Sequence, residues 1–282
     1  MSGTSEPRFS GVFRFRERIL ERMYRTLEAR GMRFSHRQPA PAPVVPVDYE
    51  AVVERFYRGL RLEGCVAVDV GAHVGRHTVP LSRCVGTRGT VHAFEPIPHA
   101  RKTLAERLFS EGCHNVAVHP YALADRADFA DFCFLPAIPE ESGLRRRDAY
   151  SQPDTRVEPL PVRVARLDDT LHPSERVRFI KMDVEGGERD VLRGAARILD
   201  QCRPIVAFEC GARAYRGYHE TSDEIYELFA SRGYEVYAIT GQLMEGAAHF
   251  RMGTELQVFW DYVALAGDDR AYAALLRPPS AP

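Results

Sequence analysis

The 282-residue sequence lacks several features that would place it in a class of proteins at once. Its formal net charge is −1, so no global positive field attracts nucleic acid or an anionic membrane. No stretch approaches the ~20 apolar residues of a membrane-spanning helix, and no signal peptide opens the chain. We therefore expect a soluble, cytoplasmic protein that spans no membrane and binds no nucleic acid.

Cysteine patterns typical of disulfide frameworks or metal centres are also missing. The six cysteines form no C-x-x-C pair and no metal-ligand spacing, so we expect reduced thiols and no metal site built from them. The apolar content of 45% nevertheless suffices for a sizeable core. The sequence therefore predicts a folded protein.

The most informative segment is an apolar strand that ends on an acid and turns through two glycines. Residues 65–70 read CVAVDV, and Gly71 and Gly75 then allow a tight turn and a close approach of the backbone to a ligand. The next strand ends on Glu95. Neighbouring strand ends of a doubly wound sheet open into one crevice, so Asp69 and Glu95 are expected to face one ligand, with Glu95 on a ribose diol.

A third glycine is absent from this turn. Dinucleotide-binding proteins use G-x-G-x-x-G to bring N–H groups to a pyrophosphate, whereas this turn reads G-x-x-x-G. A cofactor without phosphates fits better, and S-adenosylmethionine is such a cofactor. The spacing disfavours the alternative of a nicotinamide-dependent oxidoreductase. No tyrosine–lysine pair stands in an obvious catalytic spacing either.

A second block repeats the arrangement of a buried strand that ends on an acid. Residues 177–188 read VRFIKMDVEGGE and precede an amphipathic helix, and residues 203–209 read RPIVAFE. With the glycine turn, FEP at 94–96, LDDTL at 167–171 and LRGA at 192–195, these segments resemble FkbM-type methyltransferases, which are S-adenosylmethionine-dependent class I enzymes. The resemblance covers roughly residues 60 to 240, and KMDVEGGE is its most specific part.

The resemblance implies an α/β protein with a Rossmann-like class I methyltransferase fold. Such a fold has a seven-stranded, mostly parallel sheet with helices on both faces, preceded here by an N-terminal helical extension. His73 departs from the family, which usually has asparagine there, so a side-chain contact at this position is open. The cofactor-binding residues implied are Asp69, Gly71, Ala72, His73, Gly75, Thr78, Glu95, Pro96, Ala122, Leu123 and Asp183.

Methyl transfer to an oxygen requires an in-line arrangement of acceptor atom, methyl group and sulfur, so positioning is the main task. An acceptor hydroxyl also needs its proton removed, for which a positioned base supplies roughly 10²–10⁴-fold. Asp183 is the first candidate to orient or deprotonate the acceptor, with the methionine amino group as its alternative contact. Glu185 and His219 are the further candidates. Asp183 and Glu209 could hold Mg²⁺, but two visible ligands do not predict a metal mechanism.

The chain divides by composition. Residues 1–47 form a basic segment, because the first 40 residues contain nine arginines and four glutamates. This segment ends in a proline-rich linker. An apolar stripe predicts a helix there that docks on the main domain or forms a homodimer, or whose arginines contact an anionic substrate. The methyltransferase domain is expected at 48–270, with an insert or lid at 134–161 and a C-terminal tail at 271–282.

Hydrophobic periodicity places several elements of the domain. Helices are expected at 51–60 and 98–110, a capping box at 221–224, and strands at 115–122, 234–239 and 256–265. The resemblance to FkbM-type methyltransferases implies a methyltransferase acting on a hydroxyl of a sugar, glycolipid or secondary metabolite in natural product biosynthesis. Its partners would be a small-molecule or glycan substrate. The alternatives are the oxidoreductase and a non-catalytic binding protein with the same fold.

Overall fold

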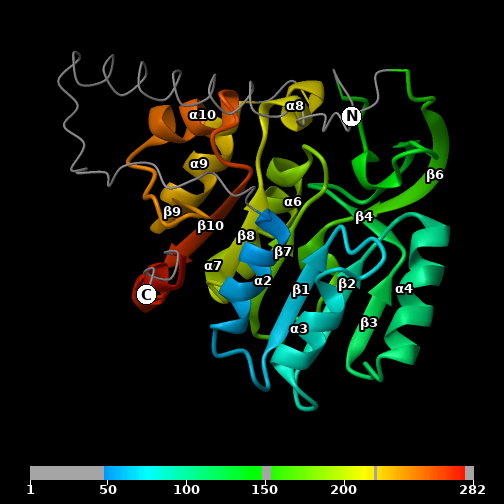
Figure 1. Ribbon diagram of the computed structural model, residues 1–282, viewed down its shortest axis with the longest axis horizontal. Coiled ribbons are helices and arrows are strands. Elements are labelled where there is room, and N and C mark those ends of the chain that lie inside the picture. The colour runs from blue at the N-terminus through cyan, green and yellow to red at the C-terminus, as the bar shows by residue number, and fades with distance from the viewer. Residues whose placement is uncertain (1–47, 148–153, 219–220, 277–282) are drawn as a thin grey trace, which may run out of the picture. The chain divides into compact units, whose positions relative to one another are not determined.

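The computed structural model describes residues 48–147, 154–218 and 221–276. They form an α/β structure whose central sheet has seven strands in the order β3-β2-β1-β7-β8-β10-β9 (Figure 1). Neighbouring strands are parallel, except that β10 runs antiparallel to β8 and β9. The predicted seven-stranded, mostly parallel sheet is confirmed. The predicted N-terminal helix lies outside the described residues.

The elements follow one another in an alternating order. The central strands are β1 (Val66–Val70), β2 (Thr90–Phe94), β3 (Val116–His119), β7 (Val177–Met182), β8 (Ile205–Glu209), β9 (Tyr234–Ala238) and β10 (Asp261–Ala266). The helices are α2 (Tyr49–Arg58), α3 (Thr78–Val85), α4 (Pro98–Ser110), α5 (Leu167–Thr170), α6 (Glu188–Gly194), α7 (Ala196–Gln201), α8 (Ala212–Tyr215), α9 (Ser222–Ala230) and α10 (Ala247–Glu255). The 3₁₀ segments are Pro139–Glu141, Arg216–Tyr218 and Gly267–Leu276.

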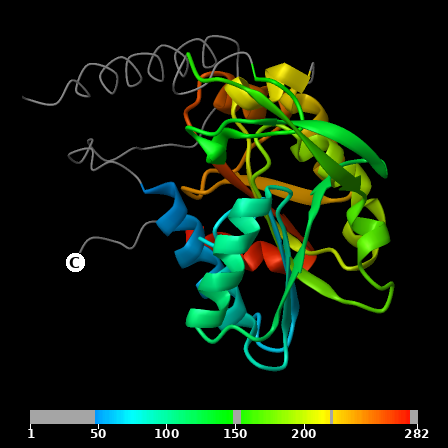
Figure 2. The ribbon, with the colours of Figure 1, turned by 90° about the vertical axis from the view of Figure 1, so that its right-hand side faces the viewer.

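Helices cover both faces of the sheet, as Figure 2 shows. Successive side chains of a strand point to opposite faces, so β1 contributes to two cores. Val68 packs in one core with Val191 of α6 and Phe229 of α9, whereas Ala67 packs in the other with Phe56 of α2. Burial on both faces explains why these strands read as continuous apolar runs in the sequence.

The predicted strand 115–122 is divided in two at Pro120. Proline has no N–H group to continue the hydrogen-bond ladder, and the chain leaves the central sheet there. β4 (Tyr121–Leu123) then pairs in parallel with β6 (Glu158–Ala165). Both belong to a separate three-stranded sheet with β5 (Asp128–Phe134).

The small sheet changes the interpretation of the insert expected at 134–161. β5 and β6 pair antiparallel, from Asp128 opposite Val164 to Phe134 opposite Glu158, so both ends of this segment are strands. Phe132 and Val162 pack with Ile97 before α4, which fixes the small sheet beside the central one. The ends of the segment are thus part of the folded domain, as strands of the small sheet. Residues 148–153 lie outside the described part of the chain.

The predicted strand 256–265 is wrong in its first half. β10 begins only at Asp261, because α10 ends at Glu255 and a turn follows it. The N–H groups of Leu256 and Val258 still donate to carbonyl oxygens of α10, those of Met252 and Gly253. The apolar residues of the turn that closes α10 therefore give a strand-like pattern in the sequence.

The predicted capping box at 221–224 does not form. Thr221 is the N-cap of α9, but its side chain makes no capping hydrogen bond. The Glu224 carboxylate pairs instead with Arg189 of α6. A tertiary ion pair therefore replaces the local contact that the sequence suggested.

The domain continues beyond residue 270, where the sequence placed its end. The 3₁₀ segment Gly267–Leu276 carries Leu276, which is 1% exposed, into the core beneath α2 and α3. Arg178 of β7 also pairs with Asp269 in this segment. The expected tail from 271 is thus folded through its first six residues.

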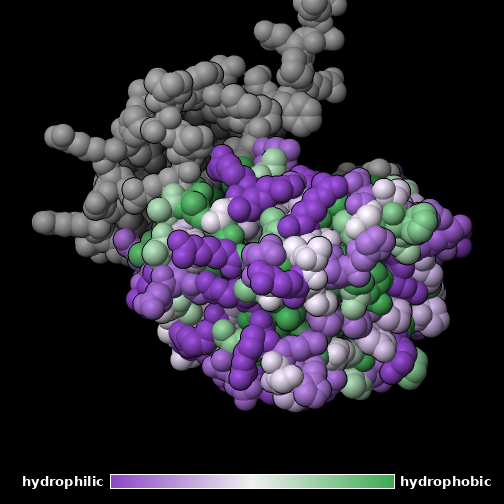
Figure 3. Space-filling view, turned by 90° about the horizontal axis from the view of Figure 1, so that it is seen from below, coloured by the Kyte–Doolittle hydropathy of each residue, from purple (hydrophilic) through white to green (hydrophobic). Residues whose placement is uncertain are grey.

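The surface seen in Figure 3 is mostly hydrophilic, with hydrophobic residues scattered over it. Among the described residues, the large apolar side chains that are most exposed are Phe109 and Phe129, which belong to separate elements, α4 and β5. No helix of the described residues is long and apolar enough to cross a bilayer.

Candidate functional site

A pocket of about 190 Å³ opens at the carboxyl ends of β1, β2 and β7. This is the place where a doubly wound sheet forms a crevice between neighbouring strand ends. Asp69, Glu95 and Asp183, the acids that end or follow these strands, all line it. The juxtaposition expected from the sequence is therefore present.

The glycine turn is fixed against the end of β2. The N–H groups of Gly71 and Ala72 both donate to the carbonyl oxygen of Phe94, each at 3.0 Å. The N–H of His73 donates to Glu95 Oε2 at 2.9 Å. His73 has φ +45°, a left-handed conformation in which asparagine and histidine are both enriched. This backbone requirement explains how histidine fits where the family usually has asparagine.

Gly71 is required by its conformation and by a close backbone neighbour. Its φ is +80°, and a Cβ there would lie 1.9 Å from the carbonyl oxygen of Asp183. We expect Gly71→Ala to lower the free energy of unfolding by about 3 kcal/mol, measured by denaturant titration. Gly64→Ala is the matched control, because Gly64 has φ +74° with nothing within 4 Å of its Cβ position. It should cost about 1 kcal/mol, and equal losses would contradict the close approach.

Asp69 is buried in β1, with 1% of its surface exposed. The Thr78 hydroxyl donates to Asp69 Oδ2 at 2.6 Å. Asp69 Oδ1 has no hydrogen-bond partner within the described residues. A buried carboxylate oxygen without a partner is costly, so this atom is suited to a donor group of a ligand.

Glu95 is also buried, at 3% exposure, and binds backbone N–H groups through both oxygens. Oε2 accepts from His73, and Oε1 accepts from Ile97 at 2.7 Å. Burial raises the pKa of Glu95 to about 7, and the two backbone hydrogen bonds and the charge of Arg101 limit the rise. Glu95 therefore titrates near neutral pH and holds the glycine turn against the start of α4.

Asp183 follows β7 and is held by Lys181 of the same strand. Lys181 Nζ lies 3.1 Å from Asp183 Oδ2, and Lys181 is 6% exposed. Burial by itself would lower the pKa of Lys181, but the charges of Asp183, Asp69 and Glu50 outweigh this and raise it above its usual value. A cationic lysine therefore stays at the base of the pocket.

Glu185 lies beside Asp183 and contacts the insert. Its carboxylate pairs with Arg147, which also lies 3.7 Å from Glu141. Burial, followed by the negative charge of Asp183, raises the pKa of Glu185 well above its usual value. The pairing with Arg147 joins the loop after β7 to the insert.

Three carboxylates form a cluster at this end of the site. The ligand atoms of Asp183, Glu185 and Glu209 lie within 4.8 Å of one another. Such oxygen atoms are ligands that Mg²⁺ accepts, and Glu185 adds a third to the two considered from the sequence. Lys181 already pairs with Asp183 and Arg147 with Glu185, and burial raises the pKa of Glu209 well above its usual value.

Most of the residues named from the sequence come together. Those that line the pocket are Asp69, Gly71, Ala72, His73, Glu95, Pro96, Ala122, Leu123, Asp183 and Glu185. Gly75 and Thr78 do not line it. Gly75 has φ +84° and packs against Leu104, and Thr78 acts through Asp69. His219 lies outside the described residues.

Sequence reasoning missed several lining residues that come from distant segments. Glu50 and Arg76 line the pocket from α2 and the turn before α3. Phe132 and Leu144 line it from β5 and the insert, and Tyr218 from the 3₁₀ turn after α8. Only packing brings these residues to the strand ends. The one signal in the sequence was the unusual length of the insert.

The sequence profile of the Methyltransferase FkbM domain matches residues 69–236. A curated relative, "Methyltransferase 1" of Beauveria bassiana (strain ARSEF 2860), is 30% identical over 142 residues. That alignment covers 45% of this chain and 57% of the relative. The chain thus spans a little over half the length of this curated relative.

Two solved structures are among those similar to the chain. A methyltransferase FkbM from Methylobacillus flagellatus KT has a TM-score of 0.46 and 18% identity, over 73% of this chain and 45% of that one. A SAM-dependent methyltransferase from Aquifex aeolicus has a TM-score of 0.38 and 16% identity, over 77% of this chain and 87% of that one. Similarity of this extent says nothing about a substrate.

Proposed function

We propose that the chain, which belongs to the FkbM methyltransferase domain family, is a methyltransferase with S-adenosylmethionine as its methyl donor. The observation that carries the proposal is the convergence of Asp69 and Glu95 on one pocket across the glycine turn. The family membership does not support the oxidoreductase alternative. A non-catalytic protein with this fold is excluded only by the experiments below.

The residues present fit such a donor. Asp69 Oδ1 is buried and without a partner among the described residues, which suits a hydrogen-bond donor of the ligand. Glu95 has unused lone pairs on both oxygens for a ribose diol. Ala122 and Leu123, apolar residues of β4, offer a surface for adenine. The close contact between Gly71 and Asp183 brings the backbone of the glycine turn to the same pocket.

The bound donor would supply an activated methyl group on a positively charged sulfur. Asp183 would orient the acceptor hydroxyl and accept its proton, and Lys181 would hold the Asp183 carboxylate in place. The insert, joined to Glu185 through Arg147, would help to exclude water from the pocket. The acceptor we propose is a hydroxyl of a sugar, glycolipid or secondary metabolite.

Two measurements test the proposal. Titration calorimetry should show binding of S-adenosylhomocysteine, with no comparable binding of NAD⁺. Incubation with S-adenosylmethionine and a panel of hydroxylated metabolites should give a gain of about 14 Da in one of them, the mass added when a methyl group replaces hydrogen. Binding without any product from a broad panel would favour the non-catalytic alternative. No binding of either nucleoside would refute the cofactor assignment.

A further inference from the structure

Glu50 reaches the pocket from outside the segment that matches the family. It lies in the first turn of α2, whereas the matched segment begins at residue 69. Its side chain is 50% exposed and lines the pocket. Neither the sequence motifs nor the mechanism above gives this carboxylate a role.

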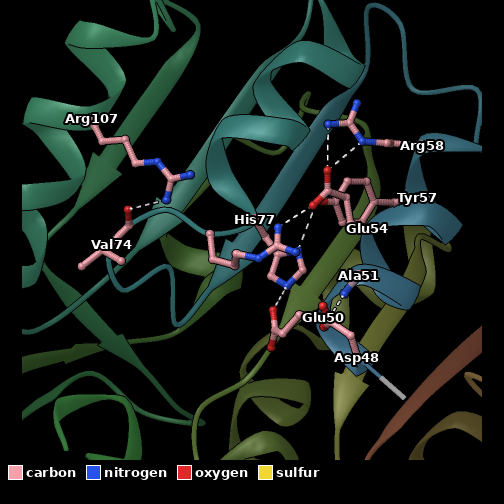
Figure 4. A network of polar contacts seen from close by, with 10 residues as sticks. Asp48, Glu50, Ala51, Glu54, Tyr57, Arg58, Val74, His77 and Arg107 are labelled. Carbon is pink, nitrogen blue, oxygen red and sulfur yellow. Dashed lines mark hydrogen bonds and ion pairs between the residues drawn. The ribbon is translucent and has the colours of Figure 1, made fainter. Parts of the chain in front are cut away.

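A buried histidine–tyrosine pair holds Glu50 in place (Figure 4). His77 Nε2 contacts the Glu50 carboxylate, and the Tyr57 hydroxyl lies 3.1 Å from His77 Nδ1. Tyr57 is fully buried and His77 is 3% exposed. Burial raises the pKa of Tyr57, so its hydroxyl keeps its proton and donates to Nδ1. The Nε2–H of His77 is then directed at Glu50.

The strand order places Glu50 at one particular end of the pocket. Glu95 follows β2, Asp69 lies in the adjacent β1, and Lys181 lies in β7 on the other side of β1. Glu50 interacts electrostatically with Lys181 and with Asp261 of β10. Glu50 therefore lies on the β7 side of β1, away from Glu95.

The charges at this end match a zwitterion. Glu50 provides a negative charge, Arg76 provides a positive one, and Lys181 pairs with Asp183 between them. The hydrogen bond from His77, together with the charges of Lys181 and Arg76, lowers the pKa of Glu50 to about 2. These effects outweigh burial, which by itself would raise the pKa. Glu50 is therefore ionised at neutral pH. An α-amino acid group carries one ammonium and one carboxylate and would be complementary to this mixture of charges.

We propose that Glu50 binds the ammonium group at the amino-acid end of the donor, with His77 and Tyr57 as positioning residues. The proposal rests on the proposed use of S-adenosylmethionine, whose adenosine would lie on the Glu95 side. It gives α2 a function that the family match does not cover.

Binding of two ligands that share the nucleoside tests this directly. S-adenosylhomocysteine carries the amino-acid end, and 5′-methylthioadenosine lacks it. By calorimetry on the full chain, Glu50→Gln should weaken S-adenosylhomocysteine about tenfold and 5′-methylthioadenosine less than about twofold. Retained binding of the second ligand shows in the same experiment that the variant is folded.

Three variants serve as controls. Arg55→Gln alters an exposed charge on α2 that does not line the pocket, so the ratio of the two affinities should be unchanged. His77→Leu removes the donor to Glu50 and should reproduce part of the selective loss. His77→Gln places an amide N–H near the position of Nε2 and should restore the ratio.

The outcomes separate this proposal from the one before it. A wild-type protein that binds neither ligand refutes both. A wild-type protein that binds both ligands equally well, or a Glu50→Gln variant that weakens both alike or neither, overturns the role of Glu50 and leaves the cofactor assignment intact. An equal selective loss in Arg55→Gln also overturns it, because the effect would then be that of α2 as a whole.

Discussion

Replacing Asp183 by asparagine is expected to lower kcat by about 10²- to 10⁴-fold, while the affinity for S-adenosylhomocysteine changes by less than about threefold. An amide oxygen can still accept a hydrogen bond from Lys181, which lies 3.1 Å from Asp183 Oδ2, so the local structure should be kept. The amide cannot accept a proton from the acceptor. Single-turnover kinetics with a methylated product as the readout, together with calorimetry, would measure both quantities.

The same variant distinguishes the two contacts considered for Asp183. Loss of cofactor affinity with little change in kcat would assign Asp183 to the amino group of the donor. Full activity would remove it from the catalytic group. Glu227→Gln, on the exposed side of α9, is the control for surface charge and should change neither quantity.

Chelation addresses the carboxylate cluster separately. If Asp183 acts as a side-chain base, excess EDTA should leave wild-type activity unchanged. Loss of activity in EDTA and recovery with Mg²⁺ would instead assign Asp183, Glu185 and Glu209 to a divalent cation.

Replacing Glu95 by alanine is expected to weaken binding of S-adenosylhomocysteine by about 100-fold or more, measured by calorimetry. Two effects combine in this variant. The ribose diol would lose its acceptor, and the N–H groups of His73 and Ile97 would lose the carboxylate that holds the glycine turn. Unchanged affinity would refute the assignment of this pocket to adenosine.

The pKa of Glu95 adds a dependence on pH with a defined sign. Burial raises this pKa to about 7, so the carboxyl group binds a proton as the pH falls from 8 to 6. The ionised form accepts from both ribose hydroxyls, whereas the protonated form has less acceptor capacity. Affinity should therefore fall by about tenfold over this interval. Glu95→Gln should bind weakly and without this dependence.

If the affinity of the Glu95→Gln variant still depends on pH, another titrating group is responsible. Glu188 and Asp261 are the candidates, because burial raises the pKa of Glu188 to about 7 and that of Asp261 to about 8. Glu188 accepts from the N–H groups of Val184 and Gly186, so its protonation would act on the loop that carries Asp183. Glu188→Gln would separate this route from the one through Glu95.

The sequence by itself determined the strands that build the pocket and the acids that end them. Apolar runs buried on both faces mark β1, β2, β7 and β8, and the positions of Asp69, Glu95 and Asp183 follow because parallel strands meet at one edge. Gly71 was identifiable for the same reason, since a positive φ next to another backbone admits only glycine. These are local properties of short segments.

Tertiary structure decided which other side chains reach that edge. Pro120 divides one predicted strand into β3 and β4, which belong to different sheets. The ion pair between Arg147 and Glu185 connects the insert to the loop after β7. Glu50 entered the pocket because α2 packs on α3, where the buried pair of Tyr57 and His77 orients it. Such contacts depend on how helices and loops pack across a distance in sequence. Periodicity and spacing carry no information about them.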